Sequence, residues 1–249
     1  MRDRMTTLAD EAARIRGEYA RRAREVPEEL YSVRNPGHLF CSLQRIRHLV
    51  RVLSAEGCFP LSDRRILDVG CGHGGWLSDF ESWGARRENL AGMELDPARA
   101  EVARRRLGPT HSDGSGGADI RAGDASRLPW PDESFDLVVQ ATVFTSILDS
   151  EMRRSVAAEI ARVLKPSGVL LWYDFFYDNP RNPNVRAVGA AEIRALFPDF
   201  RVELERVTLA PPVARRLVPV TWIGALVLEK FRLFNTHYLG VLRRRSEVR

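Results

Sequence analysis

The segment ILDVGCGHGGW, residues 66–76, passes from a short apolar run through a cluster of glycines into an amphipathic stretch. The run Ile66–Val69 is typical of a buried strand, and a helical face follows that carries Trp76, Leu77, Phe80 and Trp83. Glycines at such a turn let a ligand approach the backbone closely, and the N-terminus of the helix offers free N–H groups. The segment therefore predicts a strand–turn–helix unit that binds a nucleotide-like ligand.

Short apolar runs recur along the chain and alternate with amphipathic stretches, at residues 66–69, 90–95, 119–122, 135–140 and 169–174. This alternation is typical of a parallel sheet with crossover helices. The last part of the chain differs, because an extended run at 201–209 is followed by an apolar helical segment at 211–234 and a strand at 237–242. We therefore expect the sheet to end in an antiparallel pair.

Two helices are expected before the sheet. The first, at about residues 8–25, is polar and rich in Ala and Arg, and Pro27 closes it. The second, at about 38–55, has apolar side chains spaced three and four apart. We interpret residues 1–60 as an N-terminal helical cap that belongs to the same unit as residues 61–245. The segment 211–234 is then a helical insertion before the last strand. A chain of 249 residues is compatible with this single α/β unit.

Composition limits the classes of function. Hydrophobic residues at 44% and charged residues at 29% predict a globular protein with a sizeable core. The net charge of +5 is spread among interleaved acids, which disfavours a nucleic-acid surface. Three cysteines without metal or disulfide spacing predict no metal site and a reducing compartment. No signal peptide is recognised, and the longest apolar run, 217–228, is too short to span a membrane, so we expect a cytoplasmic protein.

The glycines alone allow two interpretations. Gly70, Gly72 and Gly75 satisfy the dinucleotide pattern GxGxxG, and Glu94 follows 24 residues after Gly70, so a nicotinamide oxidoreductase is one alternative. Asp68 opposes it, because its carboxylate would repel a pyrophosphate but would suit an ammonium group. A second acidic turn, Gly123–Ala125, and the antiparallel end of the sheet are also not expected of a dinucleotide site.

Residues 65 to about 175 resemble class I S-adenosylmethionine-dependent methyltransferases of the bacterial small-molecule type. Four motifs carry the resemblance in order: DVGCGHG (68–74), GMELDP (92–97), GDASRLPWPDESFD (123–136) and RVLKPSG (162–168). The resemblance implies a Rossmann-like seven-stranded α/β sheet of order 3-2-1-4-5-7-6, with strand 7 antiparallel. It also implies S-adenosylmethionine as methyl donor and S-adenosylhomocysteine as product.

The resemblance further implies roles for individual residues. Gly70, Cys71 and Gly72 would contact the cofactor through their backbone, and Asp68 would bind its amino group. Glu94 would accept hydrogen bonds from the ribose hydroxyls, and Gln140 would offer its carbonyl near the methionine portion. Leu95 would pack on adenine, while Asp124 and Ala125 would bind its polar edge. Two plainer roles stay open, because Asp124 could cap a turn and Glu94 could be a surface acid.

The acceptor is expected beyond the carboxyl ends of the strands, where an aromatic and polar stretch spans residues 172–182. We predict a substrate pocket formed by Phe144, Tyr173, Tyr177 and Arg181. If the acceptor is a hydroxyl, Asp174 and His38 are the candidate bases, although a helix histidine and a loop aspartate are often structural.

The predicted reaction is methyl transfer to a small molecule, at oxygen. The sequence lacks an Asn/Asp-Pro-Pro-aromatic motif at residues 140–143, which disfavours DNA or amide acceptors. The apolar segment 217–228 and the arginine-rich cap leave a lipid-linked or sugar intermediate as the first alternative acceptor. A non-catalytic cofactor-binding protein and the nicotinamide enzyme follow as alternatives, and a homodimer stays open.

Overall fold

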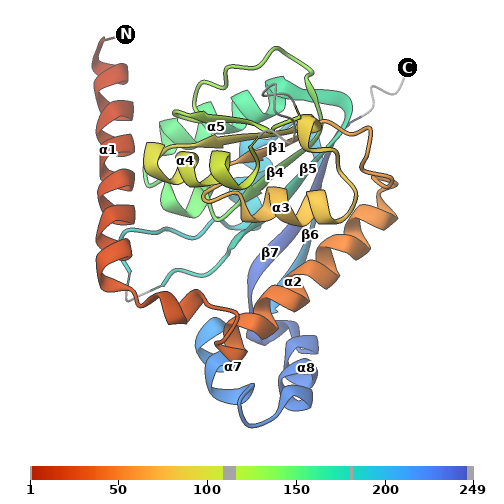
Figure 1. Cartoon of the computed structure of the whole chain (residues 1–249). Helices are drawn as coiled ribbons and strands as arrows, with labels where there is room; N and C mark the ends of the chain where they lie inside the picture. Colours follow the sequence, from red (N-terminus) through yellow and green to blue (C-terminus); the bar gives the residue numbers. More distant parts are fainter. Residues whose placement is uncertain (1, 109–115, 180–181, 246–249) are drawn as a thin grey trace.

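Seven strands form one sheet in the computed structural model, which describes residues 2–108, 116–179 and 182–245 (Figure 1). The strand order is β3-β2-β1-β4-β5-β7-β6. The strand bounds are β1 Ile66–Val69, β2 Leu90–Glu94, β3 Asp119–Ala122, β4 Phe135–Ala141, β5 Leu164–Phe175, β6 Phe200–Leu209 and β7 Asn235–Arg244. Both the order and the Rossmann-like architecture expected from the sequence are confirmed.

The register of the strands shows why β1 is central. Ile66 lies opposite Leu90 of β2 on one side and Leu137 of β4 on the other, and both pairings are parallel. The reversed strand is β7, which pairs antiparallel with β5 on one side and with β6 on the other. Because parallel strands share one carboxyl edge, the ends of β1, β2, β3 and β4 meet along one side of the sheet.

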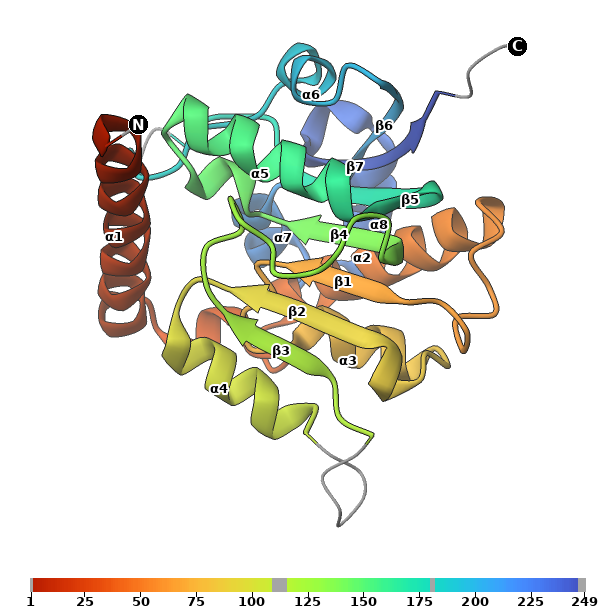
Figure 2. The same ribbon diagram turned by 90° about the horizontal axis from the view of Figure 1, so that it is seen from above.

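Helices cover both faces of the sheet (Figure 2). One face packs against α2, α3 and α4, and the other packs against α5 and α6. The helix bounds in this layer are α2 Pro36–Ala55, α3 Gly75–Ser82, α4 Pro97–Arg106, α5 Ser150–Val163 and α6 Ala190–Leu196. Short 3₁₀ turns occur at η1 Glu28–Tyr31, η2 Arg87–Asn89 and η3 Phe144–Ser146.

Helix α1, Arg2–Glu25, stands apart from these layers and runs along the carboxyl edge of the sheet (Figures 1 and 2). Ala12 and Ile15 are buried against the core that contains Val69 and Met93. Glu11 accepts hydrogen bonds from the backbone N–H groups of Leu148 and Asp149, just before α5. This helix therefore covers the edge at which ligands of open α/β sheets bind.

The segment expected as one helical stretch at 211–234 is divided into two short helices and a turn. These are α7 Pro211–Leu217, α8 Trp222–Lys230 and η4 Arg232–Phe234. Thr221 begins α8, since its side-chain oxygen accepts a hydrogen bond from Gly224 N at 3.0 Å. Proline in the interior of a helix removes a hydrogen bond, so Pro219 separates the two helices.

Candidate active site

The glycine turn after β1 has the backbone conformation that its sequence requires. Gly70 and Gly72 adopt φ of +77° and +56°, in the left-handed region that favours glycine. A Cβ on Gly70 would lie 2.4 Å from Val143 Cγ2, so no side chain fits there. The N–H groups of Gly70 and Cys71 both donate to Met93 O, which ties the turn to β2. The turn is therefore a rigid platform whose surface is backbone.

Two buried carboxylates flank this platform. Asp68, at 1% exposure on β1, has an Oδ1 atom that finds no hydrogen-bond partner among the described residues. Burial, together with the nearby Glu94, raises the pKa of Asp68 to about 8. Glu94 at the end of β2 does have partners, because its carboxylate accepts hydrogen bonds from Gly72 N at 2.8 Å and from Asp96 N at 3.0 Å. Asp68 is thus the group that lacks a partner.

Glu94 and the second acidic turn open onto one small cavity. Glu94 and Leu95 after β2, and Asp124 and Ala125 after β3, all line it together with Gly70. Asp124 also caps its own turn, because Oδ1 accepts from Ser126 N at 2.8 Å. The cavity volume is about 50 Å³. Five of the predicted cofactor residues therefore line one narrow space, whereas four others do not line it: Asp68, Cys71, Gly72 and Gln140.

Helix α1 forms the outer wall of this small cavity, which the sequence analysis did not anticipate. Ile15 and Tyr19 line the cavity, and the Arg99 guanidinium lies 4.4 Å from the centre of the Tyr19 ring. Arg99 Nη1 is also 3.7 Å from Glu94 Oε1. The spacing of Ala12, Ile15 and Tyr19 by three and four residues is the signal that could have identified this face.

A much larger cavity, of about 610 Å³, lies on the other side of the η3 turn. Its walls come from the end of α1, from η1 and α2, from β5, β6 and β7, from residues 177–179 and 182–187, and from the start of α7. The lining includes Arg22, Arg45 and Arg215 but, among the described residues, only one acid, Asp178. Its volume is within the range of small-molecule pockets, about 300–1,000 Å³.

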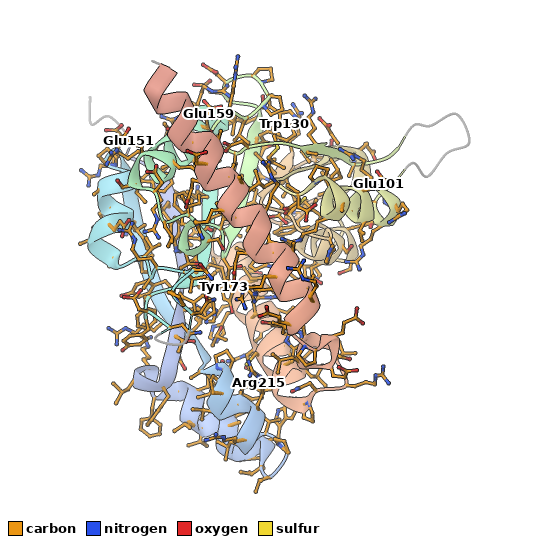
Figure 3. All side chains as sticks on the ribbon, turned by 90° about the vertical axis from the view of Figure 1, so that its left-hand side faces the viewer. Glu101, Trp130, Glu151, Glu159, Tyr173 and Arg215 are labelled. Atoms are coloured by element: carbon orange, nitrogen blue, oxygen red, sulfur yellow. The ribbon has the colours of Figure 1, made fainter. Side chains whose placement is uncertain are left out.

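The predicted substrate residues divide between this large cavity and the core. Tyr173 and Tyr177 line the cavity, and the Tyr173 hydroxyl lies 2.9 Å from Thr208 Oγ1. Phe144 instead is 0% exposed and packs against Trp172 and Phe197, so it belongs to the core. Arg181 lies outside the described residues. Figure 3, seen from the side of α1, shows Tyr173 in the middle of the domain and Arg215 towards α7 and α8.

The two candidate bases are placed differently. His38 lines the large cavity, and burial together with Arg45 and Arg215 lowers its pKa. Asp174 is fully buried, and its carboxylate accepts from Thr145 Oγ1 at 2.6 Å, Thr145 N at 3.2 Å and Phe175 N at 2.9 Å. Burial raises the pKa of Asp174 to about 6. These bonds make Asp174 a support for the η3 turn, because Thr145, not Asp174, reaches the cavity lining.

Arg45 connects the large cavity to the glycine platform, and sequence reasoning missed it. Its guanidinium lies 4.9 Å from the Trp76 ring and 3.5 Å from Asp79 Oδ2. Its Nε is buried and finds no hydrogen-bond partner among the described residues. Gln140 Nε2 at the end of β4 is likewise buried without such a partner in the described part of the chain. Folded proteins contain few unsatisfied polar groups of this kind, and a bound water, an ion or a ligand can supply the missing partner.

Neither a metal centre nor a membrane-spanning helix is found in the part of the chain that the structure describes. Within residues 2–108, 116–179 and 182–245, no group of three or more His, Cys, Asp or Glu side chains is arranged to hold a metal ion. In the same part of the chain, no helix has both the length and the apolar character needed to cross a membrane.

The central part of the chain is similar to known methyltransferases. Residues 67–172 match the family described as Methyltransferase domain. A phthiotriol/phenolphthiotriol dimycocerosates methyltransferase of Mycobacterium ulcerans is 37% identical over 114 residues, covering 46% of this chain and 38% of that protein. A fatty-acid O-methyltransferase of Mycolicibacterium smegmatis is 36% identical, covering 45% and 37%. A sterol 4-C-methyltransferase of Caenorhabditis elegans is 28% identical, covering 56% and 40%.

The matched segments span about two fifths of the length of these relatives. A solved structure supports the fold: a SAM-dependent methyltransferase from Archaeoglobus fulgidus has a TM-score of 0.53 at 16% identity, with 83% of this chain and 98% of that chain covered. The four motifs, the strand order and the family match therefore agree. Residues 67–172 match the Methyltransferase domain family, and the sheet has the strand order that the resemblance to class I S-adenosylmethionine-dependent methyltransferases implies.

Proposed function

We propose that this protein transfers a methyl group from S-adenosylmethionine to a small amphiphilic molecule held in the large cavity, at a hydroxyl oxygen. The observation that carries the proposal is the buried, unpartnered Oδ1 of Asp68, beside the glycine platform. A buried carboxylate without a partner is destabilising, so its presence there indicates a cationic ligand group that completes it. The ammonium group of S-adenosylmethionine is such a group.

The residues around the small cavity fit the rest of this cofactor. Glu94 keeps a carboxylate that can accept from ribose hydroxyls, and Asp124 can accept from an exocyclic amine. Leu95 and Ala125 provide apolar walls for a purine. Gln140 adds a buried polar group at the end of β4, on the methionine side. When bound, the cofactor supplies an electrophilic methyl carbon on a sulfonium sulfur.

Admission of a nucleoside requires the small cavity to widen. Its volume of about 50 Å³ is well below that of ordinary ligand pockets, about 300–1,000 Å³. The strands that line it are fixed by the sheet, whereas α1 is joined to the domain edge by contacts such as Arg14 with Ser146 O at 2.6 Å. We therefore expect α1, with Ile15 and Tyr19, to move outward when the cofactor binds.

The large cavity has the character of an acceptor site. Most of its exposed lining is apolar, with aromatic walls at Tyr173 and Phe175, and three arginines are also among the lining residues. Methyl transfer needs alignment and exclusion of water, which a cavity walled by α2 and three strands can supply. Its lining favours an acceptor with a large apolar body and an anionic or polar end.

His38 is the residue proposed to accept the proton of the acceptor hydroxyl. A general base must be unprotonated at the working pH, and burial beside two arginines lowers the pKa of His38. Its Nε2 lies 3.5 Å from Ser42 Oγ, and its ring packs edge-on against Tyr31, which also lines the cavity. In this assignment Asp174 positions Thr145 rather than taking part in proton transfer.

The names of the relatives support an apolar acceptor, since two of them name a fatty acid and a sterol. They name different acceptor atoms, carbon and oxygen, so the choice of oxygen rests on His38 alone. A lipid-linked or sugar intermediate is the second candidate acceptor, favoured by the arginines of the large cavity. Cytoplasmic location and a homodimer stay predictions.

A methyl-transfer assay tests the proposal. The purified chain is incubated with methyl-labelled S-adenosylmethionine and a panel of hydroxylated fatty acids, sterols and glycolipids, and labelled product is extracted. We expect transfer to at least one amphiphile and none with Asp68→Asn. Asp136→Asn is the matched control, because Asp136 pairs with Lys165 at the far edge of the sheet and should keep the activity. Binding of the cofactor without turnover on any acceptor would favour the non-catalytic alternative.

A further inference from the structure

Exposed apolar side chains gather at one end of the molecule. Ten large hydrophobic side chains in the described part of the chain are more than 40% exposed, and six of these lie between residues 220 and 234. We name these six the tip patch: Val220, Ile223, Val227, Phe231, Leu233 and Phe234. Figure 1 shows α7, α8 and the following turn projecting from the sheet, away from α4 and α5. A concentration of this kind marks an interaction surface.

The tip patch belongs to a folded element with its own small core. Ala214 and Ala225 are fully buried together with Phe40 and Leu209, which fixes α7 and α8 to α2 and β6. Asn235 Nδ2 donates to Glu229 O at 3.0 Å and thereby anchors the end of α8. The outward side chains are therefore left exposed by a helix pair whose inner face is already packed.

The exposed charges within residues 211–234, the segment that carries the tip patch, are all positive. The residues from 211 to 234 include Arg215, Arg216, Lys230 and Arg232, and the single acid, Glu229, is 5% exposed and turned inward towards Arg47. Arg232 lies 3.8 Å from Glu205 of β6 but keeps 69% of its side chain exposed. Apolar side chains bordered by Lys and Arg are typical of helices that lie in the plane of a membrane.

The length of α8 agrees with an interfacial position. Nine residues at about 1.5 Å each give a helix of about 14 Å, less than half of the hydrocarbon thickness. We propose that the tip patch is a docking surface for an anionic lipid bilayer. Val227 and Ile223, one turn apart on α8, enter the headgroup boundary, and Lys230 and Arg216 contact lipid phosphates.

A second copy of the chain fits this surface less well. Dimers usually form around a twofold axis, where the same patch meets itself. Lys230 and Arg216 would then face their own counterparts without a nearby exposed acid within residues 211–234 to compensate. Like charges brought together in an interface oppose association. An anionic bilayer supplies the complementary charge.

The docking surface also adjoins the acceptor cavity. Pro211, Pro212 and Arg215 of α7 line that cavity, while α8, the next helix, carries part of the tip patch. Docking would therefore bring the α7 side of the cavity close to the lipid phase, so that an amphiphilic acceptor could enter directly. This last step rests on the proposed function, whereas binding to the bilayer does not.

Vesicle flotation tests the proposal. The full chain is mixed with vesicles of phosphatidylcholine alone, or of equimolar phosphatidylcholine and phosphatidylglycerol, at low and high salt. We expect binding to the anionic vesicles at least about tenfold tighter than to the neutral ones, weakened by salt. Ile223→Asp should reduce this binding about tenfold, since it places a charge in the apolar face. Val33→Asp is the matched control, because Val33 is similarly exposed but lies outside the tip patch.

The outcomes separate the explanations. Both variants replace exposed residues, and their melting temperatures establish that they are folded. No binding to either vesicle, or binding that Ile223→Asp leaves unchanged, would overturn the proposal. A dimer in light scattering that Ile223→Asp disrupts, without vesicle binding, would overturn it in favour of an interface between copies. Titration of the same samples with S-adenosylhomocysteine tests the proposed function separately, and vesicle binding without such titration would still support the docking surface.

Discussion

Replacement of Asp68 by asparagine is expected to stabilise the protein and to abolish its response to the cofactor product. Asp68 is 1% exposed, its Oδ1 has no partner among the described residues, and its pKa is raised from 3.8 to about 8. Asparagine has nearly the same shape but carries no charge. The substitution therefore removes the electrostatic penalty of the free protein together with the attraction for an ammonium group.

The magnitude follows from the pKa. Because the folded state holds its proton more tightly than the unfolded state, the penalty is absent below about pH 4, increases with pH, and is complete above the raised pKa of about 8. Each pKa unit corresponds to about 1.36 kcal/mol, so the three units between the ordinary pKa and pH 7 set an upper limit of about 4 kcal/mol. The asparagine amide stays unpaired, which reduces this stabilisation by about 1–3 kcal/mol. We expect a net stabilisation of about 2 kcal/mol at pH 7, or about 4–8 °C in melting temperature.

The assay is thermal unfolding from pH 4 to pH 8, with and without S-adenosylhomocysteine. Asp68→Asn should be less stable than wild type by about 1–3 kcal/mol near pH 4, where only the cost of the unpaired amide remains. It should become the more stable protein as the pH increases towards 8. At one hundred times its dissociation constant the ligand should stabilise the wild type by about 2.7 kcal/mol, and it should stabilise the variant far less. The two effects have opposite signs, which a purely structural role of Asp68 does not predict.

Asp136→Asn is the control, and its stability should change in the opposite direction. Lys165 Nζ lies 2.9 Å from both carboxylate oxygens of Asp136, and its hydrogen bonds lower the pKa of this group against the opposing effect of burial. The ion pair of Asp136 with Lys165 stabilises the protein above the ordinary pKa of Asp136, and this stabilisation is lost as the pH falls through the lowered pKa. Asp136→Asn should therefore be less stable than wild type at pH 7. The ligand-induced stabilisation should be unchanged. If Asp68→Asn is no more stable than wild type at pH 7, or if it keeps the full ligand-induced stabilisation, Asp68 does not bind the ammonium group of the cofactor.

Three further substitutions test the site. Gly70→Ala should abolish calorimetric binding of S-adenosylhomocysteine, since the new Cβ would lie 2.4 Å from Val143 Cγ2 at a residue with positive φ. Gly84→Ala is the control: Gly84 has φ of +100° and open space around the Cβ, so this variant should lose stability but bind the ligand normally. Glu94→Gln should weaken this binding by about 1.5–3 kcal/mol because charged hydrogen bonds are lost, and unchanged affinity would contradict its assignment. His38→Asn should lower kcat by about 10²–10⁴-fold with unaltered ligand affinity, and full activity would exclude His38 as the base.

The sheet and the cofactor residues could be predicted because their signals are local. The run before Gly70, the acid at Glu94 and the acidic turn at Asp124 each lie at a strand end. A parallel sheet brings such ends to one edge, so residues far apart in sequence meet without any knowledge of packing. The strand order came from the resemblance, since residue pattern alone gave only an alternating fold with an antiparallel end.

The acceptor residues were harder to predict, because the direction of a side chain determines whether it lines the large cavity. Successive residues of a strand point to opposite faces, so Tyr173 and Asp174 cannot both face one cavity. Tyr173 lines it and Asp174 binds Thr145 on the other side, a distinction that the period of two could have indicated. Phe144 lies in a short 3₁₀ turn without such a period, and its burial against Trp172 depends on tertiary packing.

The position of helix α1 over the sheet could not be predicted from the sequence. The spacing of Ala12, Ile15 and Tyr19 predicts an apolar face on α1, but no local signal indicates which part of the sheet that face covers. Arg45 was missed for the same reason, since its role depends on the approach of α2 to Asp79 and Trp76.

Calorimetric titration of the purified chain with S-adenosylhomocysteine, with NAD as a parallel control, tests the central claim most directly. We expect saturable binding of one S-adenosylhomocysteine per chain and no binding of NAD, because Asp68 and Asp124 suit hydrogen-bond donors and repel a pyrophosphate. Failure of the folded protein to bind S-adenosylhomocysteine, or binding of NAD in its place, would contradict it.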